Sequence, residues 1–389
     1  MPVDDNVPGP PPTIGVVGAG QLGRMLHQAA IGPGLSLRFL AASPDDCAVA
    51  VHPDHDLGSA LDAAALTAFA GTVDVVTFEH EVVDLEALDR LATAGAVLRP
   101  GPQAMRAVAD KLDMRAAVAA AGLPIPPWRR ADTVDDVVEA VADWPDAVLK
   151  LSRGGYDGRG VFMVSGVDEA RAVAGELLIA GTPLLVEPRL TFEAEAAVIV
   201  ARRPGGETVV YHPVATTQVD GQCRQVVAPS GLGVAIDEQA RSMGRAVADA
   251  LDVVGLVAVE FFVVDGELSV NELAVRPHNT GHHGIDACVT SQFENHLRAV
   301  ADLPLGDPTL RSPAAMVNVI GDGDVDPRNR LAAAMAVDPG ARIHLYGKGP
   351  RHDRKLGHVT VCDADVERAA ERAWSVATAL GGQTAGHEA

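Results

Sequence analysis

Short, predominantly apolar runs alternate with stretches of helical periodicity in the first part of the chain. Such runs lie at 13–17, 35–40 and 73–78, and their length and composition are typical of strands in a buried sheet. Helical stretches lie between and after them. The alternation predicts an open parallel sheet in an N-terminal domain of residues 13–107. Residues 1–12 are proline-rich and polar, and we expect them to form a disordered tail.

Two prolines, Pro100 and Pro102, interrupt the chain before a second and larger unit. A helical run over 103–121 opens this unit. The strands expected after it lie at 161–164, 184–187, 195–202, 208–214, 257–264 and 268–273, and the helices at 167–179, 238–251 and 292–301. The last two strands form a hairpin across Asp265-Gly266.

A further boundary lies at Pro304, Gly306 and Pro308, after which short strands and helices alternate to the end. A chain of 389 residues is long enough for two or three domains that each bury a core. The pattern therefore predicts an α/β fold with domains at 13–107, 108–308 and 309–389.

The chain carries a net charge of −21. This charge argues against nucleic acids and anionic membranes as partners, because both bind basic surfaces. No apolar run approaches the roughly 18 residues of a membrane span, and the start of the sequence has neither a basic nor an apolar leader. The cysteines are scattered, which fits free thiols better than zinc or disulfides. We therefore expect a cytoplasmic protein.

The segment from Lys150 to Gly160 is the most distinctive in the chain. An apolar strand ends at Lys150, and four of the next ten residues are glycine. Glycines at this density allow positive φ angles and a close approach of backbone N–H groups to an anion. The common P-loop pattern is absent, and a strand follows instead of a helix. We interpret the segment as a phosphate lid within a hairpin; the alternative is an ordinary glycine-rich hairpin.

A second glycine-rich turn follows the first strand. Its motif Gly18-x-Gly20-x-x-Gly23 has the spacing of the dinucleotide fingerprint. That fingerprint also requires an acidic residue at the end of the second strand, where residues 40–43 are Leu-Ala-Ala-Ser. The turn therefore favours N–H contacts to some other phosphate over an NAD or FAD site. Glu79 and Glu81 end a later strand at the same edge, and ligand contact and a solvated turn are equal alternatives for them.

Lysine is rare in this chain and arginine is abundant. Every basic residue is arginine except Lys111, Lys150, Lys348 and Lys355. A genomic bias toward arginine would explain this without any function. A site that needs a compact ammonium does not accept arginine, however, so the four lysines rank as functional candidates. Two of them belong to a basic cluster over 346–358, which indicates a second phosphate contact.

Two acidic residues, Glu260 and Glu272, lie on the apolar strands of the predicted hairpin. A buried carboxylate is costly unless it meets a cation. Together with Asn271 and the glycine-rich loop, the pair predicts a magnesium–phosphate site. The alternative is that both are incidental acids on strands.

The polar segment 276–284 follows, with Arg276 and the histidines His278, His282 and His283. Zinc binding would need an H-x-x-x-H on a helix or a nearby cysteine pair; this segment has an irregular pattern, and no cysteine pair lies near it. We interpret the segment as a wall of arginine and histidine that faces an anionic intermediate.

These motifs together resemble the ATP-grasp superfamily and, within it, the 5-(carboxyamino)imidazole ribonucleotide synthases of purine biosynthesis. The resemblance extends from residue 13 to about 360, in family order. Its motifs lie at 18–25, 154–160, 271–274, 276–282, 291–294 and 354–358. It implies a Rossmann-like pre-ATP-grasp domain, a central α+β ATP-grasp domain and a small C-terminal α/β domain.

The resemblance implies ATP- and bicarbonate-dependent carboxylation of 5-aminoimidazole ribonucleotide through carboxyphosphate, in a homodimer that uses Mg2+. Asp157, as proton acceptor from the amine, Arg276 and His278 would be catalytic, and Glu260 and Glu272 would bind the metal. The residues implied in ATP binding are Lys111, Lys150, Gly154, Gly155, Tyr156, Asp157, Gly158, Arg159, Gly160, Glu187, Pro188, Arg189, Leu190, Glu195, Asn271 and Glu272. Those implied in binding the ribonucleotide and carboxyphosphate are Gly20, Gln21, Leu22, Glu79, Tyr156, Asp157, Arg159, Arg276, His278, Asn279, Lys348, Arg354 and Lys355.

Three departures from the family pattern stand out. Lys111 replaces a common arginine, Val275 replaces a proline, and His283-Gly284 replaces a Trp-Thr pair.

The alternative functions belong to three classes. The first is another ATP-grasp ligase, such as a formate-dependent glycinamide ribonucleotide transformylase or a biotin carboxylase. The others are a non-catalytic nucleotide-binding module and an NAD-dependent oxidoreductase. The glycine-rich loop together with Arg276-Pro277-His278-Asn279 favours the synthase.

Overall fold

The computed structural model describes residues 9–155 and 160–383. Its N-terminal sheet has the strand order β3-β2-β1-β4 with all strands parallel, which confirms the predicted open parallel sheet. The elements are β1 (Ile14–Val17), α1 (Gln21–Ile31), β2 (Leu37–Ala41), β3 (His55–Leu57), α2 (Ala63–Ala70), β4 (Val75–Phe78) and α3 (Leu85–Thr93). β3 was not predicted because it has only three residues, two of which are polar. The tail predicted at 1–12 lies largely outside the described residues.

The single helical run predicted over 103–121 is wrong at its centre. The chain forms α4 (Pro102–Ala109) and α5 (Lys111–Ala120), separated by Asp110. Asp110 has extended backbone angles, φ −132° and ψ 126°, and its carboxylate accepts a hydrogen bond from the Leu112 N–H. Asp110 is therefore the N-cap of a new helix, and Lys111 is the first residue of that helix.

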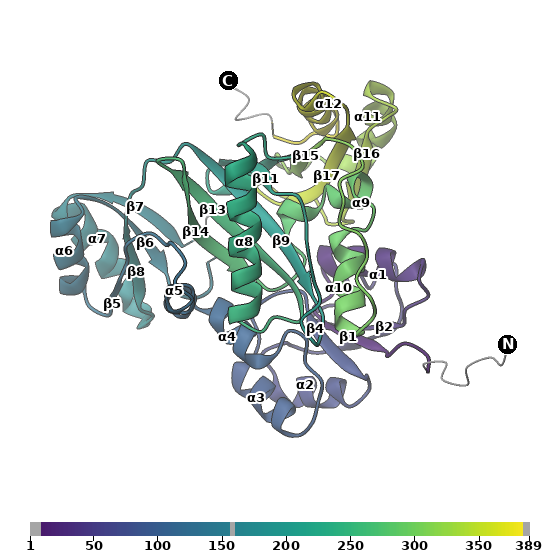
Figure 1. The fold of residues 1–389 in the computed structure, drawn as a ribbon, viewed down its shortest axis with the longest axis horizontal. Coiled ribbons are helices and arrows are strands. Elements are labelled where there is room, and N and C mark those ends of the chain that lie inside the picture. Colours follow the sequence, from purple (N-terminus) through teal and green to yellow (C-terminus); the bar gives the residue numbers. More distant parts are fainter. Residues whose placement is uncertain (1–8, 156–159, 384–389) are drawn as a thin grey trace.

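A small antiparallel sheet with the order β5-β8-β6-β7 follows. Its elements are β5 (Arg129–Ala131), α6 (Val134–Asp143), β6 (Asp146–Leu151), β7 (Val161–Ser165), α7 (Val167–Leu177), the turn η1 (Leu178–Ala180) and β8 (Leu184–Pro188). β6 and β7 pair with Lys150 opposite Val161, so the predicted strand–loop–strand hairpin is confirmed. Figure 1 shows this sheet and its two helices at one end of the molecule.

A large sheet occupies the middle of the molecule, with the order β14-β13-β9-β11-β12-β15-β17-β16 and β10 beside β9. Its central strands are β9 (Ala194–Arg202), β10 (Thr208–Val210), β11 (Val214–Val219), β12 (Gln222–Ala228), β13 (Gly255–Val264) and β14 (Glu267–Ala274). The strand predicted over 208–214 is confirmed only at its start, because β10 ends at Val210 and the irregular residues 211–213 separate it from β11. The hairpin of β13 and β14 is confirmed.

The C-terminal strands extend this same sheet, because β12 pairs with β15. The elements of this part are β15 (Ala314–Ile320), η3 (Pro327–Arg330), α11 (Leu331–Val337), β16 (Arg342–Leu345), β17 (Lys355–Cys362) and α12 (Val366–Ala379). The remaining elements are α8 (Val234–Ala250), which lies along β9 and β13 (Figure 1), η2 (Asn279–Gly281), α9 (Gly284–Ala287) and α10 (Gln292–Val300). No helix of the described chain has the length and apolar character to span a bilayer.

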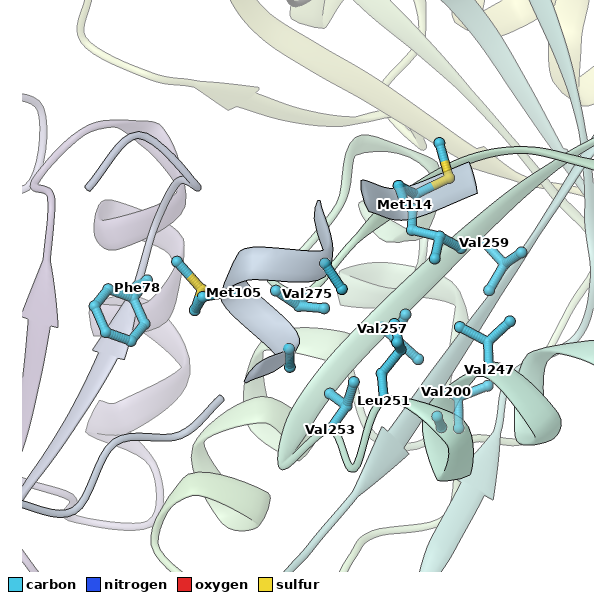
Figure 2. Packing of buried hydrophobic residues seen from close by; sticks show 14 of the residues in the cluster. Phe78, Met105, Met114, Val200, Val247, Leu251, Val253, Val257, Val259 and Val275 are labelled. Atoms are coloured by element: carbon cyan, nitrogen blue, oxygen red, sulfur yellow. The ribbon is translucent and has the colours of Figure 1, made fainter. Parts of the chain in front are cut away.

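Two apolar clusters join the N-terminal domain to the large sheet. In the first, Met105 of α4 lies between Phe78 of β4 and Val275 (Figure 2). In the second, Phe293 and Leu297 of α10 pack with residues of β1, β2 and α1. The small sheet packs a separate cluster, drawn entirely from residues 131–186. The N-terminal domain and the large sheet therefore form one packed body, and the small sheet carries its own core.

His296 of α10 is buried at the contact with the N-terminal sheet. Its Nε2 atom lies 2.8 Å from Thr77 Oγ1, and burial lowers its pKa to about 3. An unfolded chain protonates histidine near pH 6.5. Between pH about 6.5 and 3 the unfolded chain therefore binds a proton that the native protein does not, and stability falls as the pH decreases.

We expect His296→Gln to reduce this pH dependence. The unfolding free energy, measured in urea between about pH 7 and pH 5, should lose up to about 1.4 kcal/mol less per pH unit than in the wild type. His352→Gln, at a side chain that is 64% exposed, is the matched control and should leave the slope unchanged. Equal slopes in the wild type and His296→Gln would contradict the assignment.

Candidate active site

Two of the four lysines lie between the small and large sheets. Lys150, at the end of β6, has its Nζ atom 2.6 Å from Glu187 Oε2 and 3.5 Å from Asn271 Oδ1. Lys111, at the start of α5, has its Nζ atom 2.9 Å from Glu272 Oε1. The structure thus brings together five residues that the sequence singled out, from four separate segments: α5, β6, β8 and β14. Two ammonium groups here create a local positive charge within an acidic protein.

The two acidic residues of the hairpin lie side by side. Glu260 of β13 pairs directly with Glu272 of β14. Burial, the charge of Glu272 and that of Glu195 raise the pKa of Glu260 to about 8. Burial also acts to raise the pKa of Glu272, but Lys111, Lys150 and His278 together outweigh it and the net shift is downward. The pair therefore holds about one negative charge at neutral pH. A cation between the carboxylates would stabilise a second negative charge, with both groups ionised.

These carboxylates fit Mg2+ as a ligand set. Within 9–155 and 160–383, no group of three or more His, Cys, Asp and Glu side chains is placed to hold a metal by itself. Mg2+ is commonly bound by one or two carboxylates together with phosphate oxygens of a substrate and water. Glu260 and Glu272, with the lysines beside them, match that pattern.

Glu195, at the start of β9, is one of the residues implied in ATP binding. Burial raises its pKa to about 7, against the opposing effect of hydrogen bonds from Thr216 and Gln218. Its Oε2 atom is buried and has no hydrogen-bond partner among the described residues. A ligand hydroxyl would satisfy this oxygen.

The glycine turn of the N-terminal domain is filled by a carboxylate. The N–H groups of Gly20 and Leu22 donate to Glu79 at 2.5 Å and 3.0 Å. Glu79 thereby caps the N-terminus of α1, where the helix dipole favours negative charge. The turn brings together Gly20, Gln21, Leu22 and Glu79 as expected, but these two N–H groups are already engaged and are not free for a phosphate.

The segment after β14 combines fixed and buried side chains. Arg276 Nε lies 2.9 Å and 3.0 Å from the two carboxylate oxygens of Glu81, an acid at the end of β4. His278 Nε2 lies 3.8 Å from Glu260 Oε1, and Gln292 holds the backbone N–H and carbonyl of His278 at 2.9 Å and 2.6 Å. His278 therefore borders the carboxylate pair, and the charge of Glu272 also acts on Arg276.

The other side chains of the predicted wall face inward. Burial lowers the pKa of His283 to about 4 and that of His282 well below its usual range. His282 contacts Gln292, and His283 contacts the Thr280 carbonyl. Asn279 exchanges hydrogen bonds with Asn318. The expectation that His282 and His283 belong to an anion-facing wall is wrong, because both pack into the interior.

The basic segment between β16 and β17 reaches the same region. Burial lowers the pKa of Lys348, while the charge of Glu79 opposes this shift, so Lys348 lies near the glycine turn. Lys355 acts on the pKa of Glu260. Lys348 and Arg354 thus lie toward the N-terminal domain, and Lys355 lies toward the carboxylate pair.

Sequence reasoning missed two supports of the site. Arg115 of α5 is fully buried and holds Glu187, and no sequence signal other than its place on an apolar helix face marked it. Gln383 donates to Asp353 Oδ1 at 2.8 Å and anchors the segment that carries Arg354.

Four residues of the predicted phosphate lid, Tyr156, Asp157, Gly158 and Arg159, lie outside the described residues. The flanking Gly154 and Gly160 have φ angles of 79° and 78°, which favour glycine.

Models of known families match three successive segments of the chain. A ribonucleotide synthetase preATP-grasp domain matches residues 12–109, an ATP-grasp domain matches 116–293, and a phosphoribosylaminoimidazole carboxylase C-terminal domain matches 314–372. Together with the lysines and carboxylates between the two sheets, this order defines an ATP-grasp enzyme.

Curated relatives and solved structures narrow the class. The N5-carboxyaminoimidazole ribonucleotide synthase of Mycobacterium tuberculosis is 45% identical over 370 residues, which cover 93% of this chain and 86% of the relative. The Thermus thermophilus structure of that synthetase has a TM-score of 0.86 and 36% identity, and covers 96% of this chain and 100% of its own. The Aspergillus clavatus synthase, in complex with ADP and the aminoimidazole ribonucleotide, has a TM-score of 0.87 and 32% identity, and covers 95% and 98%. The chain belongs to the N5-carboxyaminoimidazole ribonucleotide synthase family, which confirms the resemblance seen in the sequence.

We expect Gly20→Ala to destabilise the glycine turn. An ideal Cβ at Gly20 would lie 2.5 Å from Glu79 Oε1, although the backbone angles themselves suit alanine. The displaced carboxylate should cost about 1–3 kcal/mol of unfolding free energy, measured in urea. Gly32→Ala, at the other end of α1 with no atom within 4 Å, is the control. The cost should shrink in a Glu79→Ala background; an undiminished cost would show that Glu79 is not the cause.

Proposed function

We propose that this chain uses ATP and bicarbonate to carboxylate the exocyclic amine of 5-aminoimidazole ribonucleotide, a step of purine biosynthesis. The observation that carries the proposal is the grouping of Lys111, Lys150, Glu260 and Glu272 between two sheets, next to Arg276 and a basic segment of the C-terminal domain. The 45% identical relative bears the name of this synthase, and a related structure contains ADP and the ribonucleotide.

The nucleotide phosphates would replace the present partners of the two lysines. Lys111 and Lys150 hold Glu272 and Glu187 at salt-bridge distance, and both side chains retain some exposure, at 16% and 12%. The backbone of Glu187, Pro188, Arg189 and Leu190 would contact the adenine, since the Glu187 carboxylate is engaged by Arg115 and Lys150. Glu195 would accept a hydrogen bond from the ribose, which suits its unpartnered Oε2 atom.

Carboxylation would proceed in two chemical stages. A bicarbonate oxygen attacks the γ-phosphorus, the bond from that phosphorus to the β–γ bridging oxygen breaks, and ADP leaves. The resulting carboxyphosphate releases phosphate and CO2, and the amine nitrogen bonds to the CO2 carbon and loses one proton. Arg276, oriented by Glu81, supplies positive charge beside the anionic intermediate. Asp157, outside the described residues, remains the proposed acceptor of the amine proton.

Glu260 and Glu272, with Asn271, would hold Mg2+, which neutralises phosphate charge during transfer. On the acceptor side, Lys348, Arg354 and Lys355 would bind the ribonucleotide phosphate, with Glu79 and the glycine turn beside its sugar. The family resemblance also supports a homodimer in the cytoplasm with small-molecule substrates alone, and light scattering on the purified protein tests the dimer.

The reaction is tested by substrate-stimulated phosphate release. We expect phosphate release from ATP to rise when the aminoimidazole ribonucleotide and bicarbonate are both present. Formate in place of bicarbonate, or glycinamide ribonucleotide in place of the aminoimidazole, should give no stimulation. Equal stimulation by formate with glycinamide ribonucleotide would assign the chain to the transformylase reaction instead.

Glu272→Gln tests the metal ligands. An amide keeps the size of the side chain but cannot neutralise the ion, so turnover at ordinary Mg2+ concentration should fall by at least about tenfold. Glu267→Gln, an exposed position on the same strand, should retain full turnover. The substitution also removes the ion pair between Glu272 and Lys111, so urea unfolding must show that the variant is folded. Near-normal turnover at ordinary Mg2+ would reject Glu272 as a ligand.

A further inference from the structure

Arg115 connects the two sheets that enclose the nucleotide site. It follows Lys111 by four residues on α5, and its side chain is 1% exposed. Its Nε atom lies 2.5 Å from Glu187 Oε1 on β8 of the small sheet. Its Nη1 atom donates to the carbonyls of Asn271 at 2.7 Å and Val270 at 3.2 Å, on β14 of the large sheet. One guanidinium therefore touches both sheets at the place where they face each other.

This contact crosses a boundary between two apolar cores. The small sheet packs residues 131–186 among themselves, while β14 belongs to the cluster of the large sheet and N-terminal domain. A planar guanidinium donates in several fixed directions and can hold a carboxylate and two carbonyls at once, which an ammonium on a flexible stem does less well. The spacing between β8 and β14 at the site thus depends on the geometry of this side chain.

Arg115 also determines how much charge Lys150 offers. Glu187 presents one oxygen to Arg115 and the other to Lys150, at 2.5 Å and 2.6 Å. The three side chains therefore carry two positive charges and one negative charge. Arg115 is fixed by its two carbonyl acceptors, so it is the lasting counter-ion of Glu187. Without it, Glu187 would be paired by Lys150 alone, and the ammonium would be neutralised and held away from an incoming phosphate.

We propose that Arg115 is a positioning residue for the nucleotide, which holds the two sheets at their working distance and leaves the Lys150 charge available to a phosphate. This inference rests on the proposed function, in which Lys150 contacts ATP. A merely structural role would lower stability and leave nucleotide affinity unchanged in the folded protein.

The test compares Arg115→Met, Arg115→Lys and Arg202→Met. Arg202 is the matched control: its side chain is 14% exposed, pairs with Asp249 and Asp252, and donates to the Val253 carbonyl, at the opposite end of β9 from Glu195. ADP affinity is measured by calorimetry, KM for ATP and for the aminoimidazole ribonucleotide by phosphate release, and stability by urea unfolding.

For Arg115→Met we expect about a tenfold loss of ADP affinity, as for one lost charged contact, a similar rise in KM for ATP and an unchanged KM for the ribonucleotide. Arg115→Lys keeps the charge but loses the planar group with several donors in fixed directions, and should lose only about threefold in ADP affinity. Arg202→Met should lose stability and bind ADP like the wild type.

Wild-type ADP affinity in folded Arg115→Met, an equal loss in Arg202→Met, or an equal rise in both KM values would each overturn the proposal. If Arg115→Met does not fold, Arg115→Lys decides, and wild-type ADP affinity in that variant overturns it. A wild-type protein that binds ADP but is not stimulated by the ribonucleotide would refute the proposed substrate and leave this test intact.

Discussion

Two carboxylates on neighbouring strands repel each other, and this repulsion is the constraint to which the rest of the site responds. Glu260 and Glu272 face each other across β13 and β14, where the surrounding strand positions are apolar. Cations from other parts of the chain stabilise both carboxylates in this position. Lys111 of α5 acts on Glu272, and Lys355 of β17 acts on Glu260. The site thus consists of an acidic pair on one sheet and basic groups delivered to it by separate segments.

The positions of the basic groups beside the acidic pair depend on how the domains are joined. The N-terminal sheet is fixed to the large sheet through Met105, Phe293 and their neighbours, and this packing holds Glu81 beside Arg276. The small sheet is attached more lightly at the site, through ion pairs and hydrogen bonds of Arg115 and Lys150. A phosphate that takes the place of a carboxylate beside an ammonium keeps that charge paired, whereas separating packed cores opens voids. A nucleotide can therefore enter between these sheets by replacing ion pairs, without disturbing a core.

The sequence predicted the residues of the site better than their partners. Glu260 and Glu272 were recognisable because a charge on an apolar strand breaks the local pattern, and Lys150 because lysine is rare in this chain and a glycine-rich loop follows it. Arg115 was not, because a single arginine on a helix resembles a solvent-exposed one, and its burial depends on Glu187, 72 residues later. The same limit explains His282 and His283, whose inward direction is set by contacts with Gln292 and Thr280. The filling of the glycine turn by Glu79 is likewise a contact across 59 residues. The open sheet and the β13–β14 hairpin follow local rules and were predictable, whereas β11 and β12 have mixed polarity and were missed or misplaced.

Because the large sheet continues into the C-terminal part, truncation of the chain before β15 would expose a strand edge. β12 forms hydrogen bonds with β15 over Gln225 to Ala228, so the C-terminal part closes an edge of the strand layer that carries the carboxylate pair. If the chain ended before β15, a row of backbone N–H and C=O groups on β12 would be exposed, and such an edge readily pairs with other chains. The C-terminal part thus keeps the central sheet from self-association as well as contributing Lys348 and Lys355. A chain cut at the apparent boundary near residue 308 would be prone to aggregate before its catalytic loss could be measured.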